Sequence, residues 1–402
     1  MLKTNEYGKE VLMMNYLIKN ADIVLEDTVL EKADLLITDN KINKIADNIS
    51  EKNAADFGKY KLIKAEGKLI IPGLIDIHSD AIEKAVQPRP SMSLSPEMAV
   101  NQLEKNLISA GITTMYHSLS LSDGSGIRST ENVVEIINFL KNNKKSYLRR
   151  KVHLRLEKTN FVAYPVIEDM INKDKLDLLS IMDHTPGQGQ YKTVEEYQEY
   201  LHKTYNLGEK EIEDVIKSKL DKKRKVNRAD LNKIIELAVN NSISVASHDD
   251  DDPEYVAWIK EIGANILEFP MKITAAEYGI SQEMMISVGA PNIVNGGSHN
   301  GNLSALDLIK DGLANIICSD YYAAAMINSI FLTAEAINDL AEAVKMATLY
   351  PAEAVGLESK IGSIKEGKIA DLILIDKKNS HPIVEEVFIN GENVYKSRFW
   401  NN

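Results

Sequence analysis

Apolar and polar residues alternate in two different ways along this 402-residue chain. From about residue 72, short apolar runs end in polar residues and are separated by segments of helical periodicity, such as Glu131–Asn143 and Arg228–Asn240. The eight runs are Leu74–Asp80, Ile112–Ser118, Lys151–Glu157, Leu178–His184, Ser242–Asp249, Asn265–Phe269, Met285–Gly289 and Ala314–Asp320. Eight strand and helix units predict an α/β fold, a (β/α)8 TIM barrel over residues 72–355. A doubly wound open sheet is the rival fold, but it has no reason to stop at eight strands.

Both ends of the chain have a β-type pattern instead. Residues 14–71 contain short alternating runs with a turn signal at Asp39-Asn40, and residues 356–402 contain similar runs around Asn390-Gly391. We therefore predict one small β-sandwich domain built from both chain ends. The first thirteen residues are polar and patternless, which indicates an extension or an upstream start.

Residues 187–226 interrupt the barrel pattern with a charged segment. It predicts helices around Val194–Lys203 and Lys210–Lys225. The segment is a solvated helical insertion, or alternatively a lid or a subunit contact beside the mouth of the barrel. The sequence leaves the oligomeric state open, a homo-oligomer included.

Composition narrows the class of partner. A formal net charge of −12 argues against binding to nucleic acid or to an anionic membrane. Cys318 is the one cysteine of the chain, so no intrachain disulfide can form. With no secretory or long apolar segment either, we expect a cytoplasmic protein with a small-molecule partner.

Five of the eight predicted strands end in side chains that can bind a metal, and active sites of (β/α)8 enzymes lie at these ends. The residues are His78, Asp80, Glu157, His184, His248 and Asp320. His78 and Asp80 are two apart on a strand and therefore point to the same side, although a strand end with a capped turn explains this pair equally simply. Imidazoles with carboxylates suit zinc, manganese or iron. We hypothesise a centre of two zinc ions bridged by Glu157, with Asp320 accepting a proton from the attacking water.

Other polar residues near the strand ends are candidate substrate contacts. Arg89 is held between two prolines and suits a phosphate, and Lys84 lies close to it in the sequence. His299 follows the seventh strand in a loop rich in glycine and asparagine, where barrels often bind phosphate. His117 follows the second strand, and Asp249 is placed to support His248.

Several of these segments also resemble a known family. PGLIDIHSD and GSIKEGKIADLILID are similar to segments of the amidohydrolase superfamily. HSDAIEKAVQPRP, SIMDHTPGQGQY, VASHDDDD, GAPNIVNGGSHNGN and SDYYAAAM resemble the PhnM phosphonate-metabolism hydrolases within it. The resemblance covers nearly the whole chain and implies a metal-dependent diphosphatase. Its substrate would be an α-D-ribose 1-alkylphosphonate 5-triphosphate, a phosphorylated sugar phosphonate, and its products the 5-phosphate and pyrophosphate.

Two rival functions remain. Another amidohydrolase acting on a cyclic amide or an N-acyl substrate would share the fold. A barrel that has lost catalysis would have lost its strand-end ligands, whereas this chain retains them.

Overall fold

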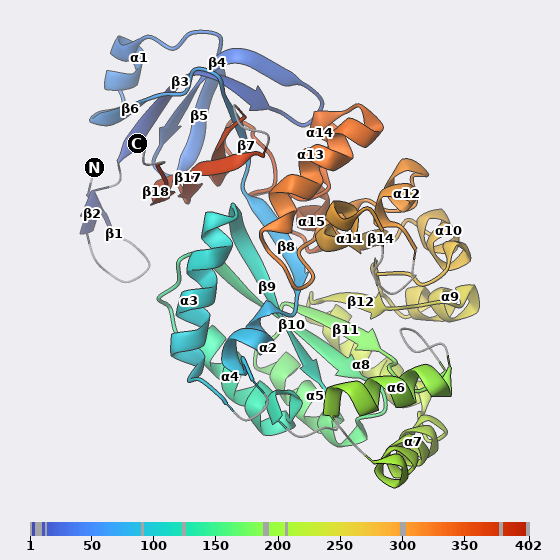
Figure 1. The fold of residues 1–402 in the computed structure, drawn as a ribbon. Helices are drawn as coiled ribbons and strands as arrows, with labels where there is room; N and C mark the ends of the chain where they lie inside the picture. Colours follow the sequence, from blue (N-terminus) through green and yellow to red (C-terminus); the bar gives the residue numbers. More distant parts are fainter. Residues whose placement is uncertain are drawn as a thin grey trace.

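The computed structural model describes residues 2–4, 10–12, 14–89, 92–122, 126–187, 193–205, 208–297, 303–377 and 381–398. It confirms the predicted barrel. Eight parallel strands lie side by side in chain order and form a nearly closed barrel (Figure 1). They are β8 (Leu74–Ser79), β9 (Ile112–Leu121), β10 (Arg149–Glu157), β11 (Leu178–Met182), β12 (Ser244–His248), β13 (Ile266–Glu268), β14 (Met285–Gly289) and β15 (Ile316–Cys318).

The barrel closes between its last strand and its first. The backbone N–H of Asp320 donates to the carbonyl of His78 over 3.0 Å, and the N–H of Asp80 donates to the carbonyl of Asp320 over 2.7 Å. Three residues that the sequence places at strand ends are therefore fixed against one another by backbone hydrogen bonds.

Helices surround the barrel and cover it with their apolar faces. They are α2 (Ala81–Val86), α3 (Pro96–Ser109), α4 (Thr130–Asn142), α5 (Tyr164–Asn172), α8 (Arg228–Asn240), α9 (Pro253–Glu261), α10 (Ile273–Ser281), α11 (Ala290–Asn295), α12 (Ala305–Lys310), α13 (Ala325–Ile337), α14 (Leu340–Lys345) and α15 (Leu349–Ala354). Short 3-10 helices lie at Gly126–Arg128 and Phe161–Ala163. Serine side chains begin several helices: Ser95, Ser129 and Ser304 each accept a hydrogen bond from a backbone N–H of the first turn.

The two chain ends form a separate mixed sheet, as the β-type pattern predicts (Figure 1). Its strands are β3 (Asn15–Val24), β4 (Val29–Thr38), β5 (Lys41–Ala46), β6 (Tyr60–Lys64), β7 (Lys68–Pro72), β16 (Leu372–Asp376), β17 (Ile383–Ile389) and β18 (Glu392–Lys396), with α1 (Glu51–Ala55) between β5 and β6. Strand β7 pairs antiparallel with β16 and so joins the two ends. Asp39, Asn40, Asn390 and Gly391 all have positive φ, so both turn signals are real turns. Strands β1 (Leu2–Thr4) and β2 (Glu10–Leu12) pair with each other in a two-stranded sheet.

One hydrophobic core runs through both parts. Leu69, Ile71, Ile373 and Val387 of the mixed sheet belong to the same cluster as the barrel helices and the outward side chains of the barrel strands. The mixed sheet therefore buries apolar surface against the barrel and helps to hold it together.

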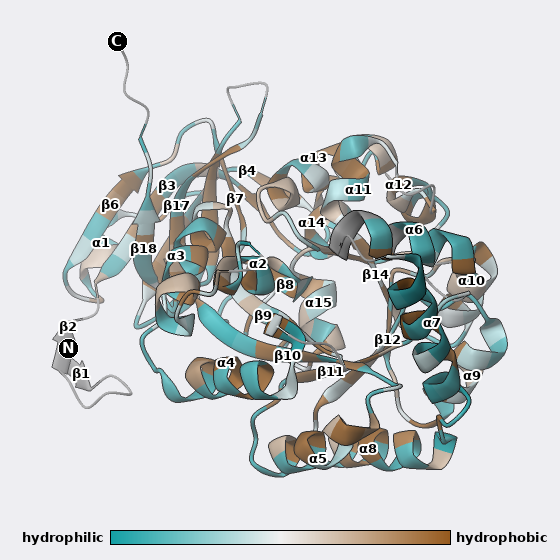
Figure 2. Ribbon diagram, turned by 60° about the horizontal axis from the view of Figure 1, so that its bottom comes forward, coloured by the Kyte–Doolittle hydropathy of each residue, from teal (hydrophilic) through white to brown (hydrophobic). Residues whose placement is uncertain are grey.

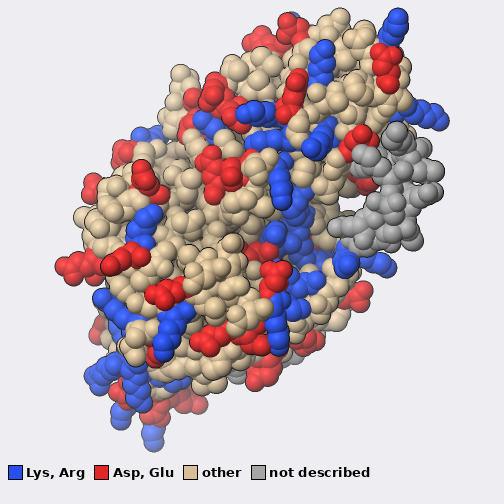
Figure 3. Space-filling model, turned by 180° about the vertical axis from the view of Figure 1, so that it is seen from behind, with Lys and Arg blue, Asp and Glu red and all other residues tan. Residues whose placement is uncertain are grey.

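The charged segment forms two helices, α6 (Val194–Tyr205) and α7 (Glu209–Lys223). Tyr197, Leu201, Ile212 and Ile216 pack together in a small cluster of their own, while the remaining surface of both helices is largely hydrophilic (Figure 2). No helix in the described part of the chain has the length and apolarity to cross a membrane. Basic and acidic side chains are both spread over the face opposite to the view of Figure 1 (Figure 3).

Candidate metal centre and active site

The first barrel strand contains a bulge that aims its last side chains. Asp76 pairs with Met115 and Ser79 pairs with His117, so β8 uses one residue more than β9 over the same distance. A bulge bends a strand and re-aims the side chains around it. His78 lies within this bulge and points into the barrel, where it meets side chains from other strands.

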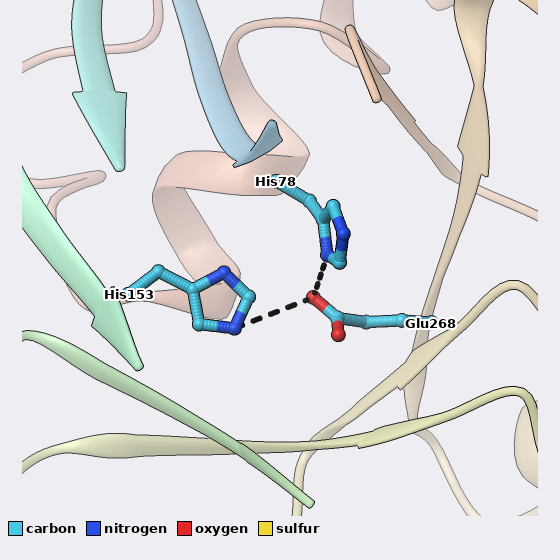
Figure 4. Close-up of side chains that lie close together, drawn as sticks. All are labelled: His78, His153 and Glu268. Carbon is cyan, nitrogen blue, oxygen red and sulfur yellow. Dashed lines mark hydrogen bonds and ion pairs between the residues drawn. The ribbon is translucent and has the colours of Figure 1, made fainter. Parts of the chain in front are cut away.

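Three histidines surround one buried glutamate in the barrel interior, and we call His78, His153, His248 and Glu268 the inner group. Figure 4 shows His78, His153 and Glu268 of this group. Nδ1 of His78 lies 2.8 Å from Oε1 of Glu268, and Nδ1 of His248 lies 3.2 Å from Oε2. Ser180 donates its hydroxyl to Oε2 over 2.6 Å. Nε2 of His153 lies 3.9 Å from Oε1. Although burial alone would raise it, His78 and His153 hold the pKa of Glu268 well below its usual range.

A second cluster lies nearer the mouth of the barrel, and we call His184, His248 and Asp249 the outer metal group. Oδ2 of Asp249 lies 3.6 Å from Nε2 of His184 and 3.6 Å from Nε2 of His248. Ligands at 2.0–2.2 Å around a tetrahedral ion are separated by about 3.3–3.6 Å, so this spacing fits a divalent metal. Glu157 stands behind the group: its Oε2 accepts the backbone N–H of His184 over 3.0 Å and lies 3.4 Å from Nδ1 of that ring.

A buried arginine contacts His248, the histidine that the two groups share. Arg155 is 4% exposed, and its Nη1 donates to Oδ1 of Asp80 over 2.6 Å. Its Nη2 lies 2.8 Å from Nε2 of His248. Although burial opposes both charges, Asp80 raises the pKa of Arg155, and Arg155 lowers the pKa of Asp80. Asp80 and Arg155 are therefore a charged pair at neutral pH.

Asp320 completes the ring of polar strand ends. Burial raises the pKa of this carboxyl; His78 opposes the shift and Asp80 adds to it. Its Oδ2 lies 3.3 Å from where a Cβ on Gly289 would stand, so this glycine leaves room for the carboxylate. A carboxylate with a raised pKa suits a group that must accept a proton.

Three residues at the strand ends have left-handed backbone: Asp249, Phe269 and Asp320 have φ of 58°, 52° and 58°. Such values are uncommon for residues other than glycine and cluster at functional sites. In this protein these three residues follow the ends of β12, β13 and β15, where the polar side chains of the site lie close together.

The structure brings together seven of the predicted site residues: His78, Asp80, Glu157, His184, His248, Asp249 and Asp320. His78 and Asp80 both reach the barrel interior, as strand alternation predicts. They do not face one point, however, because His78 contacts Glu268 and Asp80 contacts Arg155.

The predicted substrate contacts lie further out. The ammonium group of Lys84 lies 5.2 Å from the ring centre of Tyr321, next to Asp320. Arg89 is exposed after α2, and its carbonyl accepts the backbone N–H of Met92. His299 falls outside the described residues.

His117 lies apart from the pocket that we predicted for it. On β9, Ser118 bonds to His153 and Ser120 contacts Arg155, so the even-numbered residues face the barrel interior. His117 faces outward instead and is fully buried, with Nε2 3.7 Å from Oε1 of Glu104 on α3. Strand alternation places it there.

Sequence reasoning missed three residues of the site. From the sequence, His153 is expected to pack in the core, and no role is assigned to Arg155 or Glu268. Arg155 and Glu157 alternate with His153 along β10, and all three face inward. Glu268 ends a barrel strand just as the candidate metal ligands do. Strand alternation applied to every polar strand-end residue would have found all three.

Comparison with known proteins identifies the family of this chain. The model of the amidohydrolase family matches residues 69–394. The chain belongs to the amidohydrolase family. Members of this superfamily are hydrolases that generally use divalent metals, and this amidohydrolase has groups of histidine and carboxylate side chains that could hold one.

Relatives of this amidohydrolase differ in how much of it they match. It is 32% identical over 386 residues to the alpha-D-ribose 1-methylphosphonate 5-triphosphate diphosphatase of Escherichia coli K12, covering 94% of this chain and 100% of the relative. A dihydroorotase of Bacillus cytotoxicus is 48% identical over 65 residues, or 14% of its length.

Solved structures support the fold alone. The N-acetylglucosamine-6-phosphate deacetylase of Pasteurella multocida superposes with a TM-score of 0.63 at 14% identity, covering 94% of this chain and 99% of that one. A Betaaspartyl dipeptidase from Fervidobacterium islandicum superposes with a TM-score of 0.61 at 18% identity, covering 97% and 99%.

Proposed function

We propose that this amidohydrolase is a metal-dependent diphosphatase that cleaves an α-D-ribose 1-alkylphosphonate 5-triphosphate to the 5-phosphate and pyrophosphate. The observation that carries the proposal is the match to the Escherichia coli diphosphatase over that enzyme's entire length. Arg89 and His299, which the sequence makes candidate phosphate contacts, and Lys84, which lies close to Arg89 in the sequence, favour a phosphorylated substrate.

The outer metal group would hold the divalent ion. His184, His248 and Asp249 offer nitrogen and oxygen atoms at the spacing a metal needs, and this donor set suits zinc, manganese or iron. A bound ion there would supply Lewis-acid stabilisation of a phosphoryl oxygen and lower the pKa of water. The sequence predicts two zinc ions, and the outer metal group accounts for one.

Asp320 would accept the proton of the attacking water. Its raised pKa keeps the carboxylate basic enough for this role. The backbone carbonyl of His78 accepts a hydrogen bond from the backbone N–H of Asp320 and so fixes its position. Lys84 lies against Tyr321, the residue that follows Asp320 in the chain. From there its ammonium group would contact the anionic end of the substrate. Glu157 would orient His184 through the contact to Nδ1.

The role of Asp320 can be tested by the variant Asp320→Asn. General base catalysis contributes about 10²–10⁴-fold, so we expect pyrophosphate release to fall by at least about a hundredfold while the melting temperature stays close to that of the wild type. Near-full activity in the variant would remove Asp320 from the chemistry.

A second candidate is an amidohydrolase that acts on a cyclic amide or an N-acyl group. The local match to a dihydroorotase favours it over unrelated chemistries. A panel containing the ribose triphosphate, nucleoside triphosphates, hydantoins and N-acyl amino acids separates the two. Cleavage of an amide with the triphosphate left intact would decide for the second candidate.

A further inference from the structure

A second guanidinium group lies at the face of the barrel where the strands end. Arg128 is the last residue of the 3-10 helix Gly126–Arg128, which follows β9, and the segments that follow barrel strands carry the active site in this fold. Its Nε and Nη2 each donate to Oε2 of Glu83 on α2 over 2.8 Å. Arg128 therefore links the segments that follow the first two barrel strands.

A short series of contacts joins Arg128 to the polar strand ends. The second carboxylate oxygen of Glu83, Oε1, accepts the backbone N–H of Ser120 on β9 over 2.7 Å. Nη1 of Arg155 donates to the hydroxyl of Ser120 over 3.4 Å and to Oδ1 of Asp80 over 2.6 Å. Glu83 and Ser120 therefore connect the two guanidinium groups.

The two guanidinium groups differ in the donors that they have left. Arg155 is almost completely buried, and its two Nη atoms contact Asp80 and His248. The side chain of Arg128 is 42% exposed, and among the described residues its Nη1 has no hydrogen-bond partner. Nη1 carries two N–H donors, and a guanidinium stays charged. Arg128 can therefore bind an anion while it keeps its ion pair with Glu83.

The backbone around Arg128 is fixed as well. The carbonyl of Arg128 accepts the backbone N–H of Ser122, just after β9, over 3.3 Å. The side-chain oxygen of Gln87 accepts the backbone N–H of Ile127 over 3.3 Å. Because backbone and side chain are both held before a ligand arrives, little conformational freedom is left to lose on binding.

The charges in this region suit an anion with more than one phosphoryl group. Glu83 balances Arg128, and Asp80 balances Arg155. Lys84 adds a further cation, because it has no carboxylate within ion-pair distance in the described part of the chain. The planar fork of a guanidinium matches the oxygens of a phosphate.

We propose that Arg128 binds the phosphate chain of the substrate through its Nη1, at the part that leaves as pyrophosphate, and that Glu83 positions Arg128 for this contact. The inference rests on the proposed function for the identity of the substrate. Binding of free pyrophosphate at Arg128 does not depend on that identity.

Binding of pyrophosphate tests the proposal without requiring turnover. Metal-loaded protein is titrated with pyrophosphate by calorimetry, and its metal content is measured before and after. A hydrogen bond to a charged group changes affinity by about 10–100-fold, so we expect the dissociation constant to rise by that factor in Arg128→Met. The control Lys173→Met, which removes the cation of an exposed ion pair at the end of α5, should bind as the wild type does. Wild-type affinity in a folded Arg128→Met protein would overturn the proposal, as would a wild type that does not bind pyrophosphate.

A second variant keeps the ion pair and removes the fork. In Arg128→Lys, an ammonium group that bonds to Glu83 no longer presents a second nitrogen to a ligand, so we expect pyrophosphate binding to weaken by about threefold or more. This variant decides if Arg128→Met does not fold. Unchanged affinity in Arg128→Lys would then overturn the proposal.

The positioning role of Glu83 is tested by its coupling to Arg128. Glu83→Gln should raise the dissociation constant for pyrophosphate by about threefold or more in the wild-type background, and should have no further effect in Arg128→Met. A purely structural ion pair would lower the melting temperature of each variant and leave the dissociation constant unchanged. That result would contradict the proposal.

The substrate assignment and this inference fail separately. Pyrophosphate binding that depends on Arg128, in a protein that leaves the ribose triphosphate intact, would overturn the substrate assignment and support this inference. Cleavage of the ribose triphosphate with the wild-type KM in Arg128→Met would overturn this inference and leave the substrate assignment intact.

Discussion

Glu268 is the residue on which the orientation of the ligand rings depends most. Each of its oxygens faces the Nδ1 of a different histidine, His78 or His248, and so fixes which ring nitrogen faces the metal side. Loss of such a partner commonly weakens metal binding about 10–100-fold, so we expect Glu268→Gln to raise the dissociation constant for Zn²⁺ by that factor. Calorimetric titration of metal-free protein measures it. The exposed control Glu236→Gln should bind normally, and unchanged affinity in Glu268→Gln would contradict the orienting role.

His184 makes the metal-free protein sensitive to alkaline pH. Burial would lower its pKa, but Asp249 and Glu157 outweigh burial and raise the pKa to about 9. A pKa raised above the unfolded value of about 6.5 gives stability that is complete below that pH and is lost as the pH rises through about 9. We expect the melting temperature of metal-free wild type to fall between pH 6.5 and 9.5, and to fall less in His184→Asn. An equal fall in both proteins would assign the pH dependence to other groups.

The candidate metal ligands could be predicted because they end apolar runs, but their contacts could not. The sequence cannot show that Asp80 meets Arg155, because Asp80 follows β8 and Arg155 lies on β10, 75 residues further along the chain. Nor does strand alternation reveal the bulge in β8 around His78. His117 was predictable in principle, since its neighbours Ser118 and Ser120 fix which face it lies on.

At the scale of elements, the link between β7 and β8 is tightly packed. A Cβ on Gly73 would lie 2.3 Å from Oγ1 and 2.4 Å from Cγ2 of Thr113 on β9, which is closer than real contacts allow. Overpacking commonly destabilises by about 1–3 kcal/mol, so we expect Gly73→Ala to lower the free energy of unfolding by that amount in urea titrations.

A second substitution provides the control for this prediction. Thr113→Ala removes both of the nearest atoms and leaves only the Thr113 Cβ position at 2.8 Å, so it should restore part of the stability lost in Gly73→Ala. If Gly73→Ala has the urea midpoint of the wild type, the two strands are not packed as closely as described.

The eight-strand count and the turn signals were predictable because they depend on local periodicity and turn chemistry. The pairing of β7 with β16 joins residues about 300 positions apart, and local patterns do not encode it. For the mixed sheet, the sequence predicts only that both ends of the chain form β-strands, because both have the same alternating β-type pattern.

At the scale of the whole molecule, a partly buried ion pair connects the mixed sheet to the barrel. Arg149 at the start of β10 pairs with Asp371, and Asp371 also accepts the backbone N–H of Asn390 over 2.9 Å. Breaking a buried pair by removing one charge commonly destabilises by about 3–5 kcal/mol, and partial exposure of Arg149 reduces this, so we expect about 2–4 kcal/mol for Asp371→Asn. Chemical denaturation measures the loss.

An exposed pair supplies the matched control. Asp169 and Lys173 form an ion pair on α5 in which both side chains are more than half exposed, so Asp169→Asn should change stability by less than about 0.5 kcal/mol. Equal effects of the two substitutions would show that the junction contributes no more than a surface contact. Because one core runs through both parts, Asp371→Asn should still unfold in a single transition.

The central claim is hydrolysis of a ribose 1-alkylphosphonate 5-triphosphate between its first and second phosphoryl groups. Phosphorus NMR of ribose 1-methylphosphonate 5-triphosphate, incubated with metal-loaded protein and in parallel with chelator, tests it most directly. We predict equal amounts of pyrophosphate and ribose 1-methylphosphonate 5-phosphate, formed only in the metal-loaded sample. Orthophosphate as the sole released product, or an unchanged triphosphate with metal bound, would contradict it.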